Sequence, residues 1–348
     1  MGVLAASIYP ERAAATRLRL NPVLLELRNC GIPTRLWTFL DDGGLPTWIA
    51  GGSSRLGPAC RGLQGLAAGL REAEACDLML LQREALPLNT LLMEKRVLSR
   101  DRPLVWDVDD ALWTSTLGAG ALIRGTSKKY EWLARQATEV WAGNKQVADW
   151  ASAAGARVVR WVPTTVPVPP VVHNDQREND LLVWVGTPST GPYVERLLHD
   201  LRDSLRGWRV RIVGARIEAP AEVQVTQCDW SPEAEADALS RASVGLYPLD
   251  IRHPATMGKS ALKSVLFMAH GIPLIATPTR SNLDVMTHSR EGFFASSKTE
   301  WREYLGVLRD QQERRVMGAR GHQHALANFD SGTWGAELCQ TVIKLMSG

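Results

Sequence analysis

Two lysines, Lys259 and Lys263, stand four residues apart in the stretch MGKSALKSVLFMAHGIPLIAT, residues 257–277. A helix over residues 259–270 would bring both ammonium groups to one face, because residues i and i+4 are neighbours on a helix. Cations near a helix N-terminus oppose the helix dipole by about 0.3–1 kcal/mol each, unless an anion lies between them. With Gly258 allowing close backbone approach, the pair predicts a phosphate site at the helix start. Two solvated lysines are the alternative.

A second candidate is the stretch WVGTPST at residues 184–190, where a predicted strand passes into a helix. Small hydroxyl residues at such a turn can donate hydrogen bonds to phosphate oxygens together with the backbone. The residues in question are Gly186, Thr187, Ser189 and Thr190. A plain capping turn explains the same residues, with Ser189 or Thr190 as the N-cap of the helix.

Three acids, Asp107, Asp109 and Asp110, crowd the end of a predicted strand in LVWDVDDALW, residues 104–113. Neighbouring carboxylates repel one another unless they meet a cation, a hydrogen-bond donor or a sugar hydroxyl. The D-x-D spacing would suit a divalent metal with oxygen ligands. Hydrogen bonding to a polyol and capping of the next helix by Asp107 are the alternatives, and we expect no metal.

Further polar residues lie at the ends of predicted strands, or at the start of a predicted helix, in the N-terminal half of the chain. Arg83 and Glu84 come directly after a strand, where they line a site or form a surface ion pair that stabilises little. Arg17 and Arg19 open the first predicted helix and face an anionic or polyhydroxylated molecule, or water. Asn144 ends another strand and is a further candidate.

Short apolar runs alternate with helical patterns along the chain, which indicates parallel βαβ units. Strands are predicted at residues 3–9, 35–39, 78–82, 104–108, 140–142, 158–162, 181–186, 210–213, 245–247, 273–276 and 293–295. Helices are predicted at residues 16–29, 61–75, 90–99, 127–138, 145–153, 193–205, 232–240, 259–270, 312–328 and 333–346.

The stretch VPTTVPVPPVVHNDQREND, residues 162–180, is rich in proline and then polar, which is typical of a linker. It separates a predicted N-terminal domain, residues 1–165, from a C-terminal domain, residues 166–330, and residues 331–348 form a closing helix. Ligands of open parallel sheets bind beyond the carboxyl ends of the strands. We therefore expect an α/β protein with two Rossmann-like parallel-sheet domains facing across a cleft.

Composition narrows the class of function. The 348 residues carry a formal charge of +3, with 45% apolar and 22% charged residues, as in ordinary globular proteins. We expect no nucleic-acid partner, because the charge is small and no basic patch is interleaved with aromatics. Five scattered cysteines without a CxxC pair predict a reduced, cytoplasmic setting without disulfides or zinc. No apolar run reaches the ~18 residues of a membrane span, and the GxSxG, P-loop and HExxH motifs are absent.

Together these segments resemble a GT-B glycosyltransferase, close to the retaining family 4. The likeness covers nearly the whole chain, including LQREALPLN, LVWDVDDALW, VWAGNKQVADWA and WVGTPST. The stretch VGLYPLDIRHPATMGKSALKSVLFMAHGIPLIATPTRSN, residues 244–282, resembles the donor segment of a subgroup with a G-K-x-x-x-K pattern. The resemblance implies that the C-terminal domain binds a nucleotide-diphosphate sugar and that the closing helix crosses back to the N-terminal domain.

The resemblance also implies roles for individual residues. Lys259 and Lys263 would neutralise the diphosphate and act in catalysis, and Asp110 and Arg83 would approach the donor sugar or the acceptor. The donor would further contact Gly186, Thr187, Ser189, Thr190, Asp229, Trp230, Ser231, Met257, Gly258 and Ser260. The acceptor side would consist of Tyr9, Arg17, Arg19 and Asn144.

Two departures from the family pattern bear on the donor site. Many family 4 members carry two glutamates eight residues apart, where this chain has Gly258 and Leu266. The common Arg and Lys of the first C-terminal loop are replaced by Thr187 and its neighbours. The two lysines at 259 and 263 would then take over the lost diphosphate charges.

The implied activity is that of a hexosyltransferase-type enzyme that moves a sugar, with retention, from a nucleotide-diphosphate donor to a hydroxyl of a small molecule or glycan. Its leaving phosphate would take the acceptor's proton in a front-face mechanism. The nucleotide sugar would be a co-substrate, with no cofactor and no divalent metal. The alternatives are a non-catalytic relative that binds a sugar nucleotide or a partner enzyme, and a sugar-nucleotide epimerase on the same fold.

Overall fold

The computed structural model describes residues 2–50, 52–87, 89–115, 127–170, 177–252, 256 and 258–348. The chain divides into two compact units. The first contains Met1–Thr165, Gly258–Ser260 and Ser331–Gly348, and the second contains Val166–Met257 and Ala261–Asp330. Each unit holds one six-stranded sheet.

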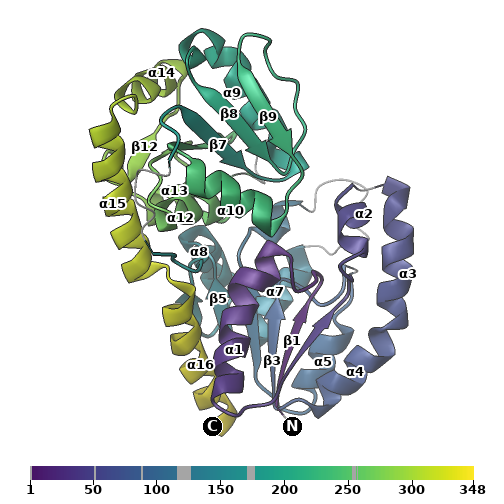
Figure 1. The fold of residues 1–348 in the computed structure, drawn as a ribbon. Coiled ribbons are helices and arrows are strands. Elements are labelled where there is room, and N and C mark those ends of the chain that lie inside the picture. Colours follow the sequence, from purple (N-terminus) through teal and green to yellow (C-terminus); the bar gives the residue numbers. More distant parts are fainter. Residues whose placement is uncertain are drawn as a thin grey trace. The chain divides into compact units, whose positions relative to one another are not determined.

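The sheet of the first unit is wholly parallel, with the strand order β2-β1-β3-β4-β5-β6 (Figure 1). Its strands are β1 (Val3–Ser7), β2 (Thr34–Thr38), β3 (Leu78–Gln82), β4 (Leu104–Val108), β5 (Glu139–Ala142) and β6 (Val159–Trp161). The four central strands are buried along their whole length. They are nearly continuous apolar runs because helices cover both faces of a parallel sheet.

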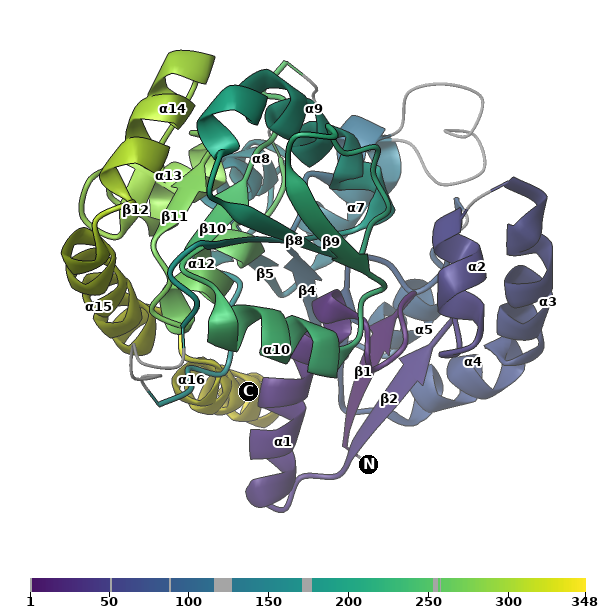
Figure 2. The same ribbon diagram turned by 45° about the horizontal axis from the view of Figure 1, so that its top comes forward.

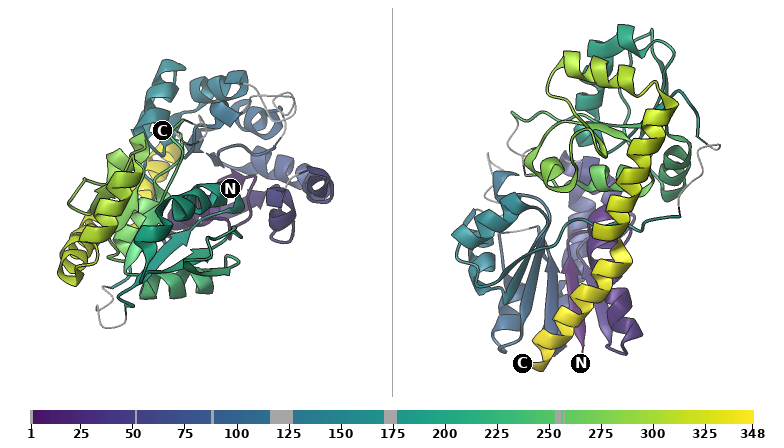
Figure 3. Two further views of the ribbon diagram at one scale, coloured as in Figure 1. Left: turned by 90° about the horizontal axis from the view of Figure 1, so that it is seen from above. Right: turned by 90° about the vertical axis from the view of Figure 1, so that its left-hand side faces the viewer.

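Alternate residues of β1 face two different cores, as the two-residue period of a strand requires. Leu4 and Ala6 belong to one core, and Val3 and Ala5 belong to the other. The second core includes residues of α1 (Asn21–Asn29) and of the C-terminal helix α16 (Ser331–Ser347), which pack against one another (Figure 3, right). The other helices are η1 (Thr16–Leu20), α2 (Gly44–Ala50), η2 (Gly52–Arg55), α3 (Leu56–Gln64), α4 (Leu66–Ala75), α5 (Leu92–Leu98), η3 (Leu112–Ser115), α7 (Ser127–Gln136) and α8 (Lys145–Ala153).

The sheet of the second unit is also parallel and has the order β12-β11-β10-β7-β8-β9 (Figure 2). Its strands are β7 (Leu181–Val185), β8 (Arg209–Val213), β9 (Gln224–Cys228), β10 (Val244–Tyr247), β11 (Leu274–Ala276) and β12 (Gly292–Phe294). One face packs against α9 (Gly191–Leu201) and α14 (Lys298–Val307). Helix α10 (Pro232–Arg241) contacts β7 and β8, and helix α12 (Leu262–Ala269) contacts β10 and β11. The remaining helices are η5 (Pro188–Thr190), η6 (Arg202–Leu205), α13 (Arg280–Val285) and α15 (Gln311–Asn328).

The predicted fold class, an α/β chain built on two parallel sheets, is confirmed. Several elements differ from the prediction. The edge strand β9 was not predicted, because its sequence QVTQC is polar and only partly buried. The single helix predicted at residues 61–75 is two helices, α3 and α4, that meet at Gly65. In the part of the chain that the structure describes, no helix is both long enough and apolar enough to cross a membrane.

Candidate functional site

In each sheet, strands are added first on one side of the initial strand and then on its other side. We call the position of this change the switch point. In the first unit, β2 follows β1 on one side and β3 to β6 follow on the other, so the switch lies between β1 and β3. In the second unit, β8 and β9 extend from one side of β7 and β10 to β12 lie on the other, so the switch lies between β7 and β10. Open parallel sheets bind ligands beyond the carboxyl ends of the strands at such points.

Tyr9 and Arg83 follow the two strands that flank the switch point of the first sheet. The Arg83 guanidinium carbon lies 5.6 Å from the centre of the Tyr9 ring. Arg83 has a φ of 59°, a left-handed conformation that costs energy for any residue other than glycine and is often found at functional sites. The backbone N–H of Arg83 donates to the Asp107 carbonyl at 2.7 Å, which stabilises this turn.

The three aspartates predicted to need a cation meet arginines. Arg83 donates from Nε to Asp109 Oδ1 at 2.5 Å and from Nη2 to Asp109 Oδ2 at 2.8 Å and Asp110 Oδ2 at 2.6 Å. Burial alone would raise the pKa of Asp109, but the charge and hydrogen bonds of Arg83 hold that pKa below its usual value. The structure does not contain the alternative ion pair between Arg83 and Glu84, because Glu84 accepts from Lys129 Nζ at 2.6 Å.

Arg19 forms a buried ion pair, so the prediction that it faces an acceptor or water is not what the structure contains. Its Nε donates to the two Asp107 oxygens at 3.0 and 2.9 Å, and its Nη1 donates to the Val162 carbonyl at 3.1 Å. Desolvation lowers the pKa of Arg19, but the neighbouring Asp107 carboxylate outweighs it and raises that pKa. Arg19 thus joins β4 to the end of β6, whereas Arg17, two residues earlier in η1, is partly exposed.

Lys259 does not lie on a helix, which corrects the prediction that it shares a helix face with Lys263. Helix α12 begins at Leu262, and Gly258–Ser260 belongs to the first unit. There the Ser260 N–H donates to Asp110 Oδ1 at 2.8 Å, and the Ala111 N–H donates to the Gly258 carbonyl at 3.0 Å. These backbone groups are therefore already bonded outside any helix. Met257 lies outside the described residues.

Asn144 is a helix cap and is almost wholly buried. Its Oδ1 accepts from the Val147 N–H at 2.9 Å at the start of α8. Its Nδ2 donates to the carbonyls of Asp109, at 3.3 Å, and Gly258, at 3.5 Å. The residue thus connects three segments of the first unit.

The turn after β7 places two exposed hydroxyls at the switch point of the second sheet. Thr187 and Ser189 are exposed, and their hydroxyl oxygens lie 2.9 Å apart. Thr190 is buried, and its hydroxyl donates to the Thr187 carbonyl at 3.0 Å. Gly186 is required before the turn, because a Cβ there would lie 2.2 Å from the Trp184 ring. The Thr187 carbonyl also accepts from the N–H groups of Thr190 and Gly191, at 2.9 and 3.2 Å, and the turn still presents two hydroxyls outward.

The segment Asp229–Ser231 follows the edge strand β9. Asp229 is exposed and lies 3.1 Å from Arg216 Nη2, and the Ser231 hydroxyl caps α10 by accepting from the Ala234 N–H at 3.1 Å. Trp230 Nε1 donates to Glu235 Oε2 at 3.0 Å. The same oxygen lies 3.9 Å from Lys263 Nζ, so a carboxylate lies beside Lys263 at the start of α12.

Comparisons with known proteins agree with this architecture. HepE from Anabaena, solved with UDP and glucose, has a TM-score of 0.69 and 15% identity over 98% of this chain and 99% of that chain. Sucrose-phosphate synthase from Thermosynechococcus elongatus has a TM-score of 0.70 and 13% identity over 99% of both chains. The chain has the GT-B fold. Residues 190–340 also match a family model described as "Glycosyl transferase-like", and no curated protein matches the sequence.

Sequence reasoning missed several polar residues of the GT-B core. At the ends of β1 and β3, the buried Ser7 hydroxyl donates to Gln82 Oε1 at 3.0 Å, and Gln82 Nε2 reaches Asp109 Oδ1 at 3.4 Å. A polar residue that ends an otherwise apolar strand was the available signal. For Glu235, whose partner Lys263 belongs to a different helix and is set by tertiary packing, no comparable signal exists.

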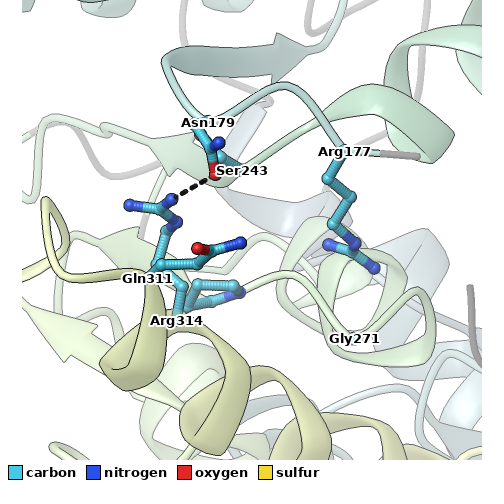
Figure 4. A pocket seen from close by; sticks show the side chains of 7 residues that line it. Arg177, Asn179, Ser243, Gly271, Gln311 and Arg314 are labelled. Carbon is cyan, nitrogen blue, oxygen red and sulfur yellow. Dashed lines mark hydrogen bonds between the residues drawn. The ribbon is translucent and has the colours of Figure 1, made fainter. Parts of the chain in front are cut away.

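The second unit also has a polar recess at the opposite, amino edge of its sheet (Figure 4). Arg177 donates to the carbonyls of Ala242 and His270, and Arg314 donates to the Leu308 carbonyl at 2.7 Å and to Asn179 Oδ1 at 3.1 Å. Ala242, His270 and Leu308 end α10, α12 and α14. Both arginines therefore cap helix C-termini, where cations are stabilised by the dipole, and lie away from the switch point.

Proposed function

We propose that this protein is a glycosyltransferase that moves a sugar from a nucleotide-diphosphate donor to a hydroxyl-bearing acceptor. The turn Gly186–Thr190 supports the proposal most. It lies at the switch point of the second sheet, and its exposed Thr187 and Ser189 hydroxyls precede the N-terminus of α9. Exposed hydroxyls at a helix start suit a diphosphate. The HepE structures with UDP and UDP-glucose are consistent with such a donor.

The proposed chemistry retains the configuration at the anomeric carbon. The bond from that carbon to the leaving phosphate oxygen breaks, a bond to the acceptor oxygen forms on the same face, and the acceptor proton passes to the departing phosphate. Lys259 and Lys263 would stabilise the negative charge that develops on the phosphate, which is the effect that fixed cations exert in a site closed to water. The stereochemistry is tested by assigning the anomeric configuration of donor and product by NMR, and an inverted product contradicts it.

We place the acceptor on the first unit, at its switch point, where the Tyr9 ring and the strained Arg83 lie together. Arg17, partly exposed in η1, is a further acceptor-side candidate. We propose transfer without a divalent metal, since Asp107, Asp109 and Asp110 already accept hydrogen bonds from Arg19 and Arg83. Carboxylates engaged in this way are poorly placed to ligate Mg²⁺.

The decisive experiment is a calorimetric and thermal-shift screen of UDP, GDP, dTDP and ADP sugars, with and without Mg²⁺. A donor at 100 times its dissociation constant should stabilise the protein by about 2.7 kcal/mol. The variant Thr187→Val/Ser189→Ala should bind about tenfold more weakly, while Ser99→Ala/Ser152→Ala, which removes two exposed hydroxyls at other helices, should bind normally. Donor binding without release of nucleoside diphosphate would favour the non-catalytic alternative, and no binding at all would overturn the proposal.

A further inference from the structure

Gly258 and Ser260, the two residues that flank Lys259, are bonded through their backbone to the carboxyl edge of the first sheet. The Ser260 N–H donates to Asp110 Oδ1 at 2.8 Å, and the Gly258 carbonyl accepts from the Ala111 N–H at 3.0 Å and from Asn144 Nδ2 at 3.5 Å. Lys259 lies between two bonded residues, so its Cα is fixed from both sides. We call Gly258–Ser260 the anchored segment.

Steric fit makes the anchored segment specific to glycine at its first position. A Cβ on Gly258 would lie 2.1 Å from the Ala111 Cβ and 3.2 Å from the Ala111 Cα and N. A contact of 2.1 Å is impossible without movement of one of the two backbones. The same close approach recurs at Gly143, where a Cβ would lie 2.6 Å from the Asp109 Cα. Both glycines therefore allow the turn after β4 to pack between its neighbours.

Asp110 and Asn144 have their polar atoms committed to these contacts. Asp110 Oδ2 accepts from Arg83 Nη2 at 2.6 Å while its Oδ1 accepts from Ser260 N–H. Asn144 uses Oδ1 for the cap of α8 and Nδ2 for the carbonyls of Asp109 and Gly258. Asp110 thus links the switch-point residue Arg83 to the backbone beside Lys259.

We propose that Asp110 and Asn144 are positioning residues that fix Lys259 for the donor diphosphate, and that neither contacts the sugar or the acceptor. This inference rests on the proposed function, because it assigns Lys259 to a diphosphate. It differs from a substrate-binding role in one measurable respect. A nucleoside diphosphate contains neither the transferred sugar nor the acceptor, so its affinity responds to Asp110 only if Asp110 acts through Lys259.

The anchored segment itself is tested first by amide hydrogen exchange of the full chain, followed by mass spectrometry of peptides that contain Ser260. Asp110→Ala removes the acceptor of the Ser260 N–H, and Gly258→Ala forces the segment off Ala111. Both should speed exchange at this position at least tenfold, and Asp203→Ala, an exposed acid of η6, should not. Unchanged exchange in Asp110→Ala would overturn the proposal.

A rescue pair separates positioning from general damage. In Gly258→Ala/Ala111→Gly the clashing methyl group is gone, and the nearest remaining atoms lie at 3.2 Å, a tight contact that small shifts can relieve. We expect this double variant to regain most of the protection that Gly258→Ala loses. Ala111→Gly alone should behave like the wild type. A double variant no better than Gly258→Ala would contradict the steric account.

The second part of the proposal, that the anchored segment positions Lys259 for the diphosphate, is tested by calorimetry. The titrant is whichever of UDP, GDP, dTDP or ADP binds the wild type. Asp110→Ala and Gly258→Ala should weaken this binding at least tenfold, and the rescue pair should restore it. In a Lys259→Ala background the effect of Asp110→Ala should largely vanish, because residues acting as one unit are not additive. Unchanged nucleoside diphosphate affinity in Asp110→Ala would overturn the assignment. If no nucleoside diphosphate binds the wild type, the proposed function fails, and the exchange data alone decide whether the segment is anchored.

Discussion

The carboxyl edges of the two sheets differ in the polar groups that they carry. At the edge of the first sheet, Asp107, Asp109 and Asp110 are matched by Arg19 and Arg83 through direct hydrogen bonds. At the edge of the second sheet, the turn after β7 presents the neutral hydroxyls of Thr187 and Ser189 to solvent. The first edge is internally satisfied, whereas the two hydroxyls of the second edge lie next to each other and face solvent.

The charged pairs of the first edge stabilise the fold, whereas the hydroxyls of the second edge are available to a ligand. A buried ion pair is expensive to desolvate and contributes mainly when both partners stay in place, so Arg19 and Asp107 are best understood as structural. Exposed hydroxyls at a helix start lose little when unoccupied and gain hydrogen bonds when an anion arrives. Mutation of the Arg19–Asp107 pair at the first edge should therefore act on stability, and mutation of Thr187 or Ser189 at the second edge should act on binding.

The largest effect is expected from Arg19→Met, which leaves Asp107 buried without its partner. Loss of one member of a buried pair typically costs about 3–5 kcal/mol, so the free energy of unfolding in urea should fall by that order. Arg61→Ala, which breaks the exposed pair with Asp41, should change it by less than about 0.5 kcal/mol. Recovery of stability in Arg19→Met/Asp107→Leu would support desolvation as the cause. A small effect of Arg19→Met would mean that the first edge is not structural.

A smaller effect, and one on binding alone, is expected from Lys259→Ala/Lys263→Ala. If both lysines neutralise the diphosphate, donor affinity should fall at least 100-fold, equivalent to about 2.8 kcal/mol. Lys298→Ala removes an exposed lysine of the second unit that pairs with Asp200 and should leave affinity unchanged. Calorimetric titration with the donor is the measurement.

Glu235 sharpens this prediction, because its carboxylate lies 3.9 Å from Lys263 Nζ. If Lys263 serves the diphosphate, Glu235→Gln should leave donor affinity intact or raise it, since a competing anion is removed. If Lys263 is only a partner of Glu235, Glu235→Gln and Lys263→Ala should have similar effects on stability and neither should affect binding. Full donor affinity in the double lysine variant would refute the role of both lysines.

The sequence predicted the sheets better than the site, for a physical reason. Strands such as β3 and β4 are buried on both faces and therefore appear as unbroken apolar runs, whereas the polar edge strand β9 carries no such signal. Arg83 and Thr187 were found because they follow buried strands, and parallel topology brings the ends of neighbouring strands to one edge. The start of α12 was misjudged because the partners of Gly258 and Ser260, at Asp110, Ala111 and Asn144, lie more than a hundred residues away.

The smallest predicted effect is the loss of the stability contribution of Asp109 at low pH. The pKa of Asp109 is held below its usual value by Arg83, so its contribution to stability is complete above the unfolded pKa of about 3.9 and is lost as the pH falls through the lower folded value. The stability difference between the wild type and Asp109→Asn should therefore be constant from pH 7 to 5. It should shrink below about pH 4, by roughly 1.4 kcal/mol for each unit of pKa depression.

Urea titrations of both proteins at pH 7, 5, 4 and 3 make this measurement, and Thr187→Val serves as the matched comparison at the second edge. Thr187 does not titrate, so its variant should follow the wild type at every pH with a constant offset. A difference between the wild type and Asp109→Asn that stays constant to pH 3 would mean that Asp109 is not held ionised by Arg83. Asp109 would then give the first edge no charge that the fold holds ionised. The contrast drawn between the two edges would not apply to this residue.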